Sequence, residues 1–265
     1  MKSRSLWLII PIIAGLVIAF FYFTQSRKPA VPEQVPVVSM PEEPEEEPPP
    51  VQMAPPAPEE EVAPLPVLDS SDTLVREEVT AAVGEALANR FLVKQAIVRK
   101  IAITVDNLPR ESINMRVRAV PGLGGEFLVS DRGDEIILDE ANFARYEPFV
   151  SMVESIGAED LAELYVRYYP LLQQAYEELG YPSRQFHDRL MDVIAHLLET
   201  PEVKGPIRLV RPHVLYKYAD PGLEARSVGQ KAMIRMGPQN VAIIKAKLSE
   251  LERALQARAE PLKEG

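Results

Sequence analysis

The chain has 265 residues, a net charge of −10 and no cysteine. The lack of cysteine excludes disulfides, thiolate chemistry and cysteine-ligated metals, and it fits an oxidising compartment such as a periplasm. Residues 1–66 hold four basic residues and nine Glu, so the remainder carries 25 basic and 30 acidic residues. A mildly acidic domain with intermixed signs lacks the positive field that a phosphate backbone requires, so we expect no nucleic-acid partner.

Residues 1–28 predict a single-pass transmembrane anchor with basic flanks. Positions 6–23 form an uncharged apolar run, which as a helix would span roughly 27 Å, close to the hydrocarbon thickness of a bilayer. The expected partner of this segment is inner-membrane lipid. A cleaved signal peptide is the alternative, but the run exceeds a usual h-region and no small-x-small cleavage pattern follows it.

Residues 29–66 predict a disordered, acidic, proline-rich linker. They contain thirteen Pro and nine Glu, a composition that favours extended polyproline II and leaves little apolar area to bury. Fully extended, the linker would reach ~120 Å at ~3.1 Å per residue. Between residues 29 and 75 there is no Lys or Arg, so translocation meets little charge resistance. We therefore expect a periplasmic C-terminal domain; a cytoplasm-facing domain is the alternative.

Residues 67–258 predict an α-rich globular domain, followed by a disordered tail at 259–265. Its first half opens with N-cap chemistry at 69–72, before a helix to about Leu87. A second helix is expected from about Asn89 to Thr104. Two short apolar runs, 126–129 and 135–138, flank Asp131-Arg132-Gly133-Asp134 and predict a β-hairpin.

The second half of the domain reads as further helices with one extended segment. Helices are expected from 139 to about 156, and from 158 to 179 with an interruption at Pro170. Ser183 should cap the next helix, which ends at Glu199, and residues 207–218 look extended. Two last helices are expected at 227–235, which Ser227 should cap, and at 239–258, and Gly237-Pro238 separates them. The fold class is therefore α+β and predominantly helical: a compact helical domain with a short β-hairpin.

One polar row could carry chemistry. Asp188, Asp192 and His196 follow one another at a spacing of four residues, so they line one face of the helix 183–199. Apolar residues occupy the opposite face, which indicates that the polar row is the solvated face. Successive turns of a helix lie ~5.4 Å apart, so side chains on three successive turns do not easily bind one metal ion together. We expect no metal site, no cofactor and no catalytic residue; a hydrolase using these carboxylates is the alternative.

Arginine and tyrosine suggest a different kind of site. Several of these residues crowd into positions 145–181, and Lys231 and Arg235 lie one turn apart on a later helix. Helical spacing places most of the tyrosines in the core; the functional alternative is a groove in which rings and guanidinium groups stack on a sugar or peptide. The candidate binding residues are Arg145, Tyr146, Arg167, Tyr168, Tyr181, Lys231 and Arg235.

Several segments together resemble a known family. They are 105–110 (VDNLPR), 142–146 (NFARY), 169–182 (YPLLQQAYEELGYP), 188–190 (DRL), 196–198 (HLL) and 229–238 (GQKAMIRMGP). They are similar to the bacterial domain-of-unknown-function family 3014, over roughly residues 65–255. The resemblance implies a membrane-anchored envelope protein of Gram-negative bacteria. It implies no reaction, cofactor or catalytic residue.

The function expected from these features is that of a non-catalytic binding or scaffolding domain. The anchor would place it at the bacterial inner membrane, single-pass, and the linker would let it search for an envelope protein or cell-wall partner. The alternatives are an envelope hydrolase that uses the carboxylates of the helix 183–199 and a cytoplasm-facing scaffold.

Overall fold

The computed structural model describes residues 64–114, 116, 118–119, 126–131, 133, 135–213 and 215–258. The predicted anchor, the predicted tail and the predicted linker up to residue 63 lie outside these ranges. Within them, none of the helices combines the length and the apolar character needed to cross a bilayer.

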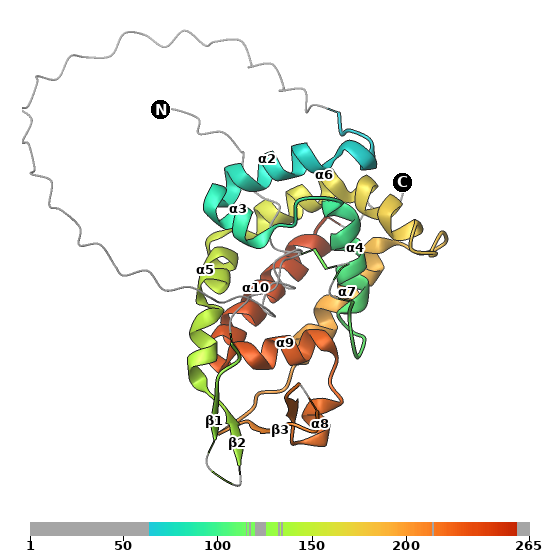
Figure 1. Ribbon diagram of the computed structural model, residues 1–265. Coiled ribbons are helices and arrows are strands. Elements are labelled where there is room, and N and C mark those ends of the chain that lie inside the picture. Colours follow the sequence, from blue (N-terminus) through green and yellow to red (C-terminus); the bar gives the residue numbers. More distant parts are fainter. Residues whose placement is uncertain are drawn as a thin grey trace, which may run out of the picture. The chain divides into compact units, whose positions relative to one another are not determined.

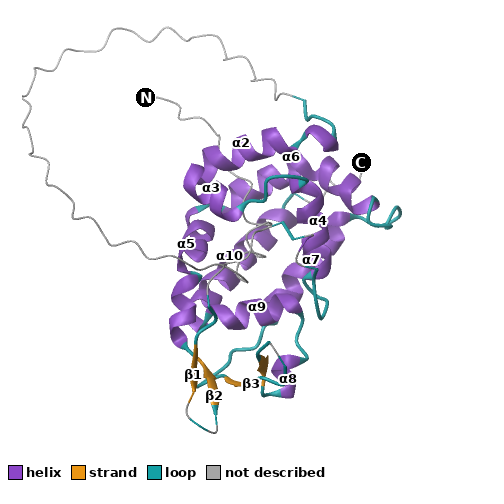
Figure 2. Cartoon of the chain, in the orientation of Figure 1, coloured by secondary structure: helices purple, strands orange, loops and turns teal. Residues whose placement is uncertain are grey.

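Helices make up most of the described chain, and a small sheet lies at one end of it (Figures 1 and 2). The α-helices are α2 (Asp72–Val83), α3 (Glu85–Phe91), α4 (Ile97–Asn107), α5 (Glu147–Ser155), α6 (Ala158–Glu177), α7 (Phe186–Leu198), α8 (Pro221–Glu224), α9 (Val228–Met236) and α10 (Pro238–Gln256). The 3₁₀ turns are η2 (Leu68–Ser70) and η4 (Glu140–Arg145), and the strands are β1 (Val129–Asp131), β2 (Ile136–Leu138), β3 (Arg208–Val210) and β4 (Lys217–Tyr218).

The core forms around α6. Tyr165, Tyr168, Leu172 and Tyr176 recur at helical spacing and are buried, which confirms the core interpretation of these rings. The predicted interruption at Pro170 is wrong, because α6 continues through it. A proline inside a helix costs about 3 kcal/mol, and burial of the apolar residues on either side of it offsets that cost.

The boundaries of α2, α3 and α4 differ from the prediction. Instead of a helix to Leu87 and a second from Asn89 to Thr104, α2 ends at Gly84 and α4 begins only at Ile97. Gly84 has φ +82° and ψ 155°, a conformation that is essentially restricted to glycine. The chain therefore turns at Gly84, where an amphipathic pattern alone suggests a continuous helix.

Asp72 caps α4 from a distance and not its own helix. Its two carboxylate oxygens accept hydrogen bonds from the backbone amides of Ala96 and Ile97, each at 2.7 Å. The amides at a helix N-terminus otherwise lack partners. This carboxylate therefore joins α2 to the start of α4.

Replacing Asp72 with alanine should lower the free energy of unfolding by about 1–2 kcal/mol, the usual cost of losing an N-cap. Urea denaturation of the purified protein measures this change. Asp69→Ala is the matched control, because Asp69 is largely exposed and pairs only with Arg99 at the surface. The loss of stability in Asp69→Ala should stay below about 1 kcal/mol. Equal losses in the two variants would contradict the conclusion that Asp72 caps α4.

Two other predicted caps have different outcomes. Ser227 caps α9 as expected, since its hydroxyl accepts a hydrogen bond from the amide of Gln230 at 3.1 Å. Ser183 does not cap α7, which begins at Phe186. Instead, the side-chain oxygen of Gln173, on α6, accepts a hydrogen bond from the backbone amide of Phe186 at 2.8 Å. A cap supplied by another helix leaves no local sequence signal.

The predicted hairpin is confirmed as β1 and β2, and it belongs to a larger sheet. Strands β3 and β4, from the segment expected to be extended, complete an antiparallel order β1-β2-β3-β4. A second apolar cluster under this sheet includes Leu138, Leu209, Tyr218 and Ile234, the last contributed by α9. The domain is thus mostly helical with a small four-stranded antiparallel sheet.

Candidate functional site

The seven predicted binding residues fall into three separate groups in the structure. Arg145, Tyr146, Lys231 and Arg235 lie around the joint between the sheet and α9. Arg167 and Tyr168 lie on α6 beside Glu78 of α2. Tyr181 belongs to a third group, near Asp106. No single surface therefore unites these residues.

The residues of the first group, beside the sheet and α9, contact other residues of the same domain. Arg145 donates to the backbone oxygen of Glu126 and to the side-chain oxygen of Asn142. The Arg235 guanidinium lies over the Tyr218 ring, 5.6 Å from its centre. Lys231 donates to the backbone oxygen of Glu224 at 3.0 Å. Tyr146 is buried, and burial raises its pKa to about 12. These contacts hold the small sheet and η4 against α9.

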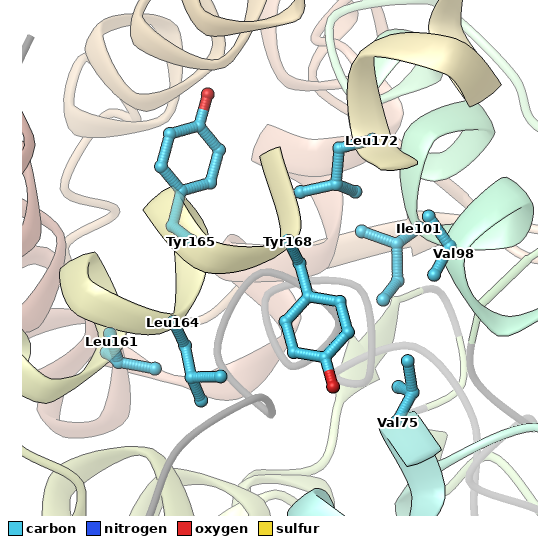
Figure 3. A pocket seen from close by; sticks show the side chains of 8 residues that line it. All are labelled: Val75, Val98, Ile101, Leu161, Leu164, Tyr165, Tyr168 and Leu172. Atoms are coloured by element: carbon cyan, nitrogen blue, oxygen red, sulfur yellow. The ribbon is translucent and has the colours of Figure 1, made fainter. Parts of the chain in front are cut away.

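The second group borders a cavity between α2, α4 and α6 (Figure 3). Arg167 pairs with the buried carboxylate of Glu78 at 2.8 Å. Tyr168 extends from α6 toward Val75 of α2, while the Tyr165 hydroxyl points away on the other side of the helix. Burial, together with the neighbouring Glu78 carboxylate, raises the pKa of Tyr168. The polar groups of this region thus tie α2 to α6.

The cavity itself is small and almost entirely apolar. Its volume is about 40 Å³, and the lining residues are Val75, Val98, Ile101, Leu161, Leu164, Tyr165, Tyr168 and Leu172. Pockets that bind organic ligands usually measure roughly 300–1,000 Å³, whereas one water needs about 10–15 Å³. In this conformation the cavity has room for water but not for an organic substrate.

The third group brings distant residues together at the surface. Arg189 of α7 donates through Nε to the Asp106 carboxylate at 3.0 Å and through a terminal nitrogen to the Asp106 backbone oxygen at 2.5 Å. One terminal nitrogen of Arg110 donates to the same carboxylate at 2.6 Å and to the Tyr181 hydroxyl at 3.0 Å. Arg184 lies over the Tyr181 ring at 5.6 Å. We call these five residues the Asp106 cluster.

The cluster combines a buried acidic centre with a basic outer surface. The side chain of Asp106 is 5% exposed, whereas those of Arg110 and Arg189 are 51% and 25% exposed. Two guanidinium groups, those of Arg110 and Arg189, contact the Asp106 carboxylate, and a third, that of Arg184, lies over the Tyr181 ring. The cluster thus holds three positive charges and one negative charge. The nearby Glu178 does not offset this excess of positive charge, because Glu178 pairs with Arg99 at 2.6 Å, which lowers the pKa of that carboxyl.

Stacking fixes the aromatic part of the cluster. Tyr181 stacks on the buried Tyr176, with ring centres 4.8 Å apart and an interplanar angle of 28°. Burial raises the pKa of Tyr176, and the charges of Asp106, Arg189 and Arg184 also act on this hydroxyl. The Tyr181 ring is therefore held between Tyr176 and Arg184.

The sequence indicates only part of this cluster. Asp106 lies in the last turn of α4, and Arg110 follows it by four residues, just beyond the end of the helix, which is near enough for an ion pair. Arg189, by contrast, follows Asp106 by 83 positions, and Arg184 lies in a loop. The sequence-based prediction included Tyr181 but missed Asp106, Arg110, Arg184 and Arg189.

The predicted polar row of α7 is solvated. Asp188 and Asp192 are exposed, and no group of three His, Asp or Glu residues in the described ranges is arranged to hold a metal ion. His196 contacts the Ser227 hydroxyl through Nε2 at 2.8 Å, and burial lowers the pKa of this imidazole. Since Ser227 also caps α9, the contact joins α7 to α9.

Comparison with known proteins places the domain in a family. Residues 97–252 match the family described as "Protein of unknown function (DUF3014)". The chain belongs to the DUF3014 family. No curated protein and no solved structure matches the chain. The match confirms the resemblance seen in the sequence, and it begins at α4, so α2 and α3 precede the DUF3014 region.

The segments that carry the DUF3014 resemblance meet at the Asp106 cluster. Asp106 and Arg110 come from segment 105–110, Tyr181 from segment 169–182 and Arg189 from segment 188–190. A fourth segment reaches the same place, because the amide of Gly229 donates to the backbone oxygen of Leu108 at 3.0 Å. Four of the six segments that carry the resemblance thus meet at one corner of the domain.

Proposed function

We propose that the domain is a non-catalytic binding module of a membrane-anchored envelope protein. Its site is the Asp106 cluster, and its partner is an acidic segment of an envelope protein. The observation that carries the proposal is the surplus of guanidinium groups in the Asp106 cluster. Sites that recognise ligands commonly consist of preorganised charged groups on a rigid scaffold.

The geometry of the cluster supports a carboxylate as the recognised group. Guanidinium groups bind carboxylates through paired, charge-assisted hydrogen bonds, and Asp106 already accepts such bonds from Arg110 and Arg189. A sugar would instead need an open aromatic face. The Tyr181 ring already stacks on Tyr176 and lies under Arg184. These contacts favour an acidic protein segment over a cell-wall glycan.

The cellular setting of the proposal rests on the sequence. The apolar run 6–23 supports anchoring in the bacterial inner membrane, and the proline- and glutamate-rich residues 29–66 support a long, extended linker. Such a linker raises the effective concentration of the domain near the membrane without fixing its position. A topology reporter fused after Gly265 tests the periplasmic orientation; a cytoplasmic signal would contradict it.

Crosslinking in living cells tests the binding surface. A photo-crosslinking residue at Ser183, which is exposed beside Arg184, should trap one specific envelope protein with the full-length chain. Arg184→Glu should lower the adduct yield about tenfold or more, because a like charge would then face the acidic partner.

The matched control is Arg253→Glu, the same charge change on the exposed part of α10. The C-terminal end of α10 lies near Glu159, at the start of α6. The Asp106 cluster lies beyond the opposite, C-terminal end of α6. This variant should leave the adduct unchanged. An equal loss in both variants, adducts to glycan alone, or no adduct would contradict the proposal.

A further inference from the structure

The segment that forms β3 and β4 differs in charge from the rest of the chain. Residues 203–219 contain Lys204, Arg208, Arg211 and Lys217 but no Asp or Glu, whereas the whole chain carries a net charge of −10. All four basic side chains belong to exposed residues. Arg208 pairs across the sheet with Glu135 at 2.9 Å. The segment that forms β3 and β4 is therefore locally basic on an acidic protein, whereas the neighbouring β1–β2 hairpin carries Asp131 and Glu135.

The same end of the domain exposes large apolar side chains. Leu215 is 74% exposed, Val210 is 44% exposed and Leu128 is 41% exposed. Of these three, Leu215 and Val210 belong to the segment of β3 and β4, and neighbouring exposed apolar residues mark an interaction site more often than single scattered ones. Figure 1 shows the sheet at the end of the domain opposite α2.

Cross-strand pairing places an aliphatic and a basic side chain together on the exposed face of β3 and β4. Val210 of β3 pairs directly with Lys217 of β4, and residues paired in this way present their side chains on the same face. Where the two strands are joined, the Arg211 guanidinium lies over the Tyr216 ring at 5.2 Å. Tyr216 itself is partly buried and packs against Phe127 beside the apolar cluster under the sheet.

We propose that this sheet end docks on an anionic phospholipid surface, with Leu215 entering the boundary between headgroups and acyl chains. Basic residues next to exposed aliphatic groups are the composition of interfacial membrane-binding elements. Arg211 and Lys217, which flank Leu215 in the sequence, would contact the lipid phosphates.

A lipid surface fits these residues better than an acidic peptide does. A peptide partner would need pockets for its anchoring side chains, but Leu215 itself projects outward, as its exposure shows. A protruding aliphatic side chain needs a deformable apolar medium, which the acyl boundary provides. The inference is independent of the Asp106 cluster, because no residue is shared between the two surfaces.

The test uses the full-length chain reconstituted into vesicles. Because the chain has no cysteine, a single His213→Cys change places an environment-sensitive fluorophore next to Leu215. In phosphatidylcholine vesicles containing phosphatidylglycerol, this probe should shift to the blue and be quenched by nitroxide-labelled lipids. In phosphatidylcholine alone, both changes should be much smaller. A probe at Ala86→Cys, an exposed position of α3 at the end of the domain opposite the sheet, is the matched control and should respond in neither mixture.

Two further variants separate the apolar from the ionic contribution. Leu215→Asp should abolish the blue shift, and circular dichroism should show unchanged folding because Leu215 is exposed. Arg211→Glu with Lys217→Glu should weaken docking at least about 25-fold, since each basic residue near an anionic membrane contributes roughly a fivefold change in affinity. The proposal is overturned if the probe stays in water with anionic vesicles, if Leu215→Asp changes nothing, or if polyglutamate shifts the probe while vesicles do not.

Discussion

Gly237→Ala is expected to lower the free energy of unfolding by about 2–6 kcal/mol, a large fraction of the roughly 5–15 kcal/mol by which a typical domain is stable. Gly237 ends α9 with φ +86° and ψ 160°, a conformation that costs other residues about 1–3 kcal/mol. An added Cβ would also lie 2.5 Å from Cγ of Phe143. Relieving this clash by moving a packed ring costs about 1–3 kcal/mol more. Urea and thermal denaturation of the variant measure the sum.

Gly84 offers a matched control for the backbone part of this effect. Its φ and ψ, +82° and 155°, nearly equal those of Gly237, but an added Cβ at Gly84 meets no atom within 4 Å. Gly84→Ala should therefore show only the conformational cost of about 1–3 kcal/mol. The difference between the two variants measures the clash with Phe143. Equal losses of stability in the two variants would show that the Phe143 ring moves freely. That result would contradict the close packing of Phe143 against Gly237.

The parts of the fold that could be predicted are those encoded by local patterns. The spacing of Tyr165, Leu172 and Tyr176 marks the buried face of α6, and the Ser227 cap adjoins the helix that it caps. The errors have a shared physical cause: a partner from elsewhere in the chain. Asp72 caps α4, and Gln173 caps α7. Hydrogen bonds between distant elements leave no periodic signal.

The candidate site shows the same limit more strongly. Composition drew attention to arginine and tyrosine, but it could not distinguish buried rings such as Tyr146 from the partly exposed Tyr181. The decisive residue, Asp106, lies between Arg110, just beyond the end of its own helix, and Arg189, 83 positions later. Only the packing of α4 against α7 brings these charges together. The sequence could thus predict the kinds of side chain involved but not their common location.

Asp106→Asn should have the second large effect, a loss of about 2–3 kcal/mol in the free energy of unfolding. Removing one partner from a buried ion pair typically costs about 3–5 kcal/mol. Here the cost is reduced, because Arg110 and Arg189 are partly exposed and water can hydrate them. The asparagine keeps the shape of the side chain, so the change reports mainly on charge. Urea denaturation measures the loss.

Asp192→Asn is the matched control for Asp106→Asn, because Asp192 is exposed on α7. It should change stability by less than about 0.5 kcal/mol. A double-mutant cycle between Asp106→Asn and Arg189→Met should give a coupling of roughly 1–3 kcal/mol. If the two effects simply add, Asp106 and Arg189 do not interact energetically. Asp106 would then not be the charge that positions Arg189, and the guanidinium groups of the proposed binding surface would lack the anchor that preorganises them.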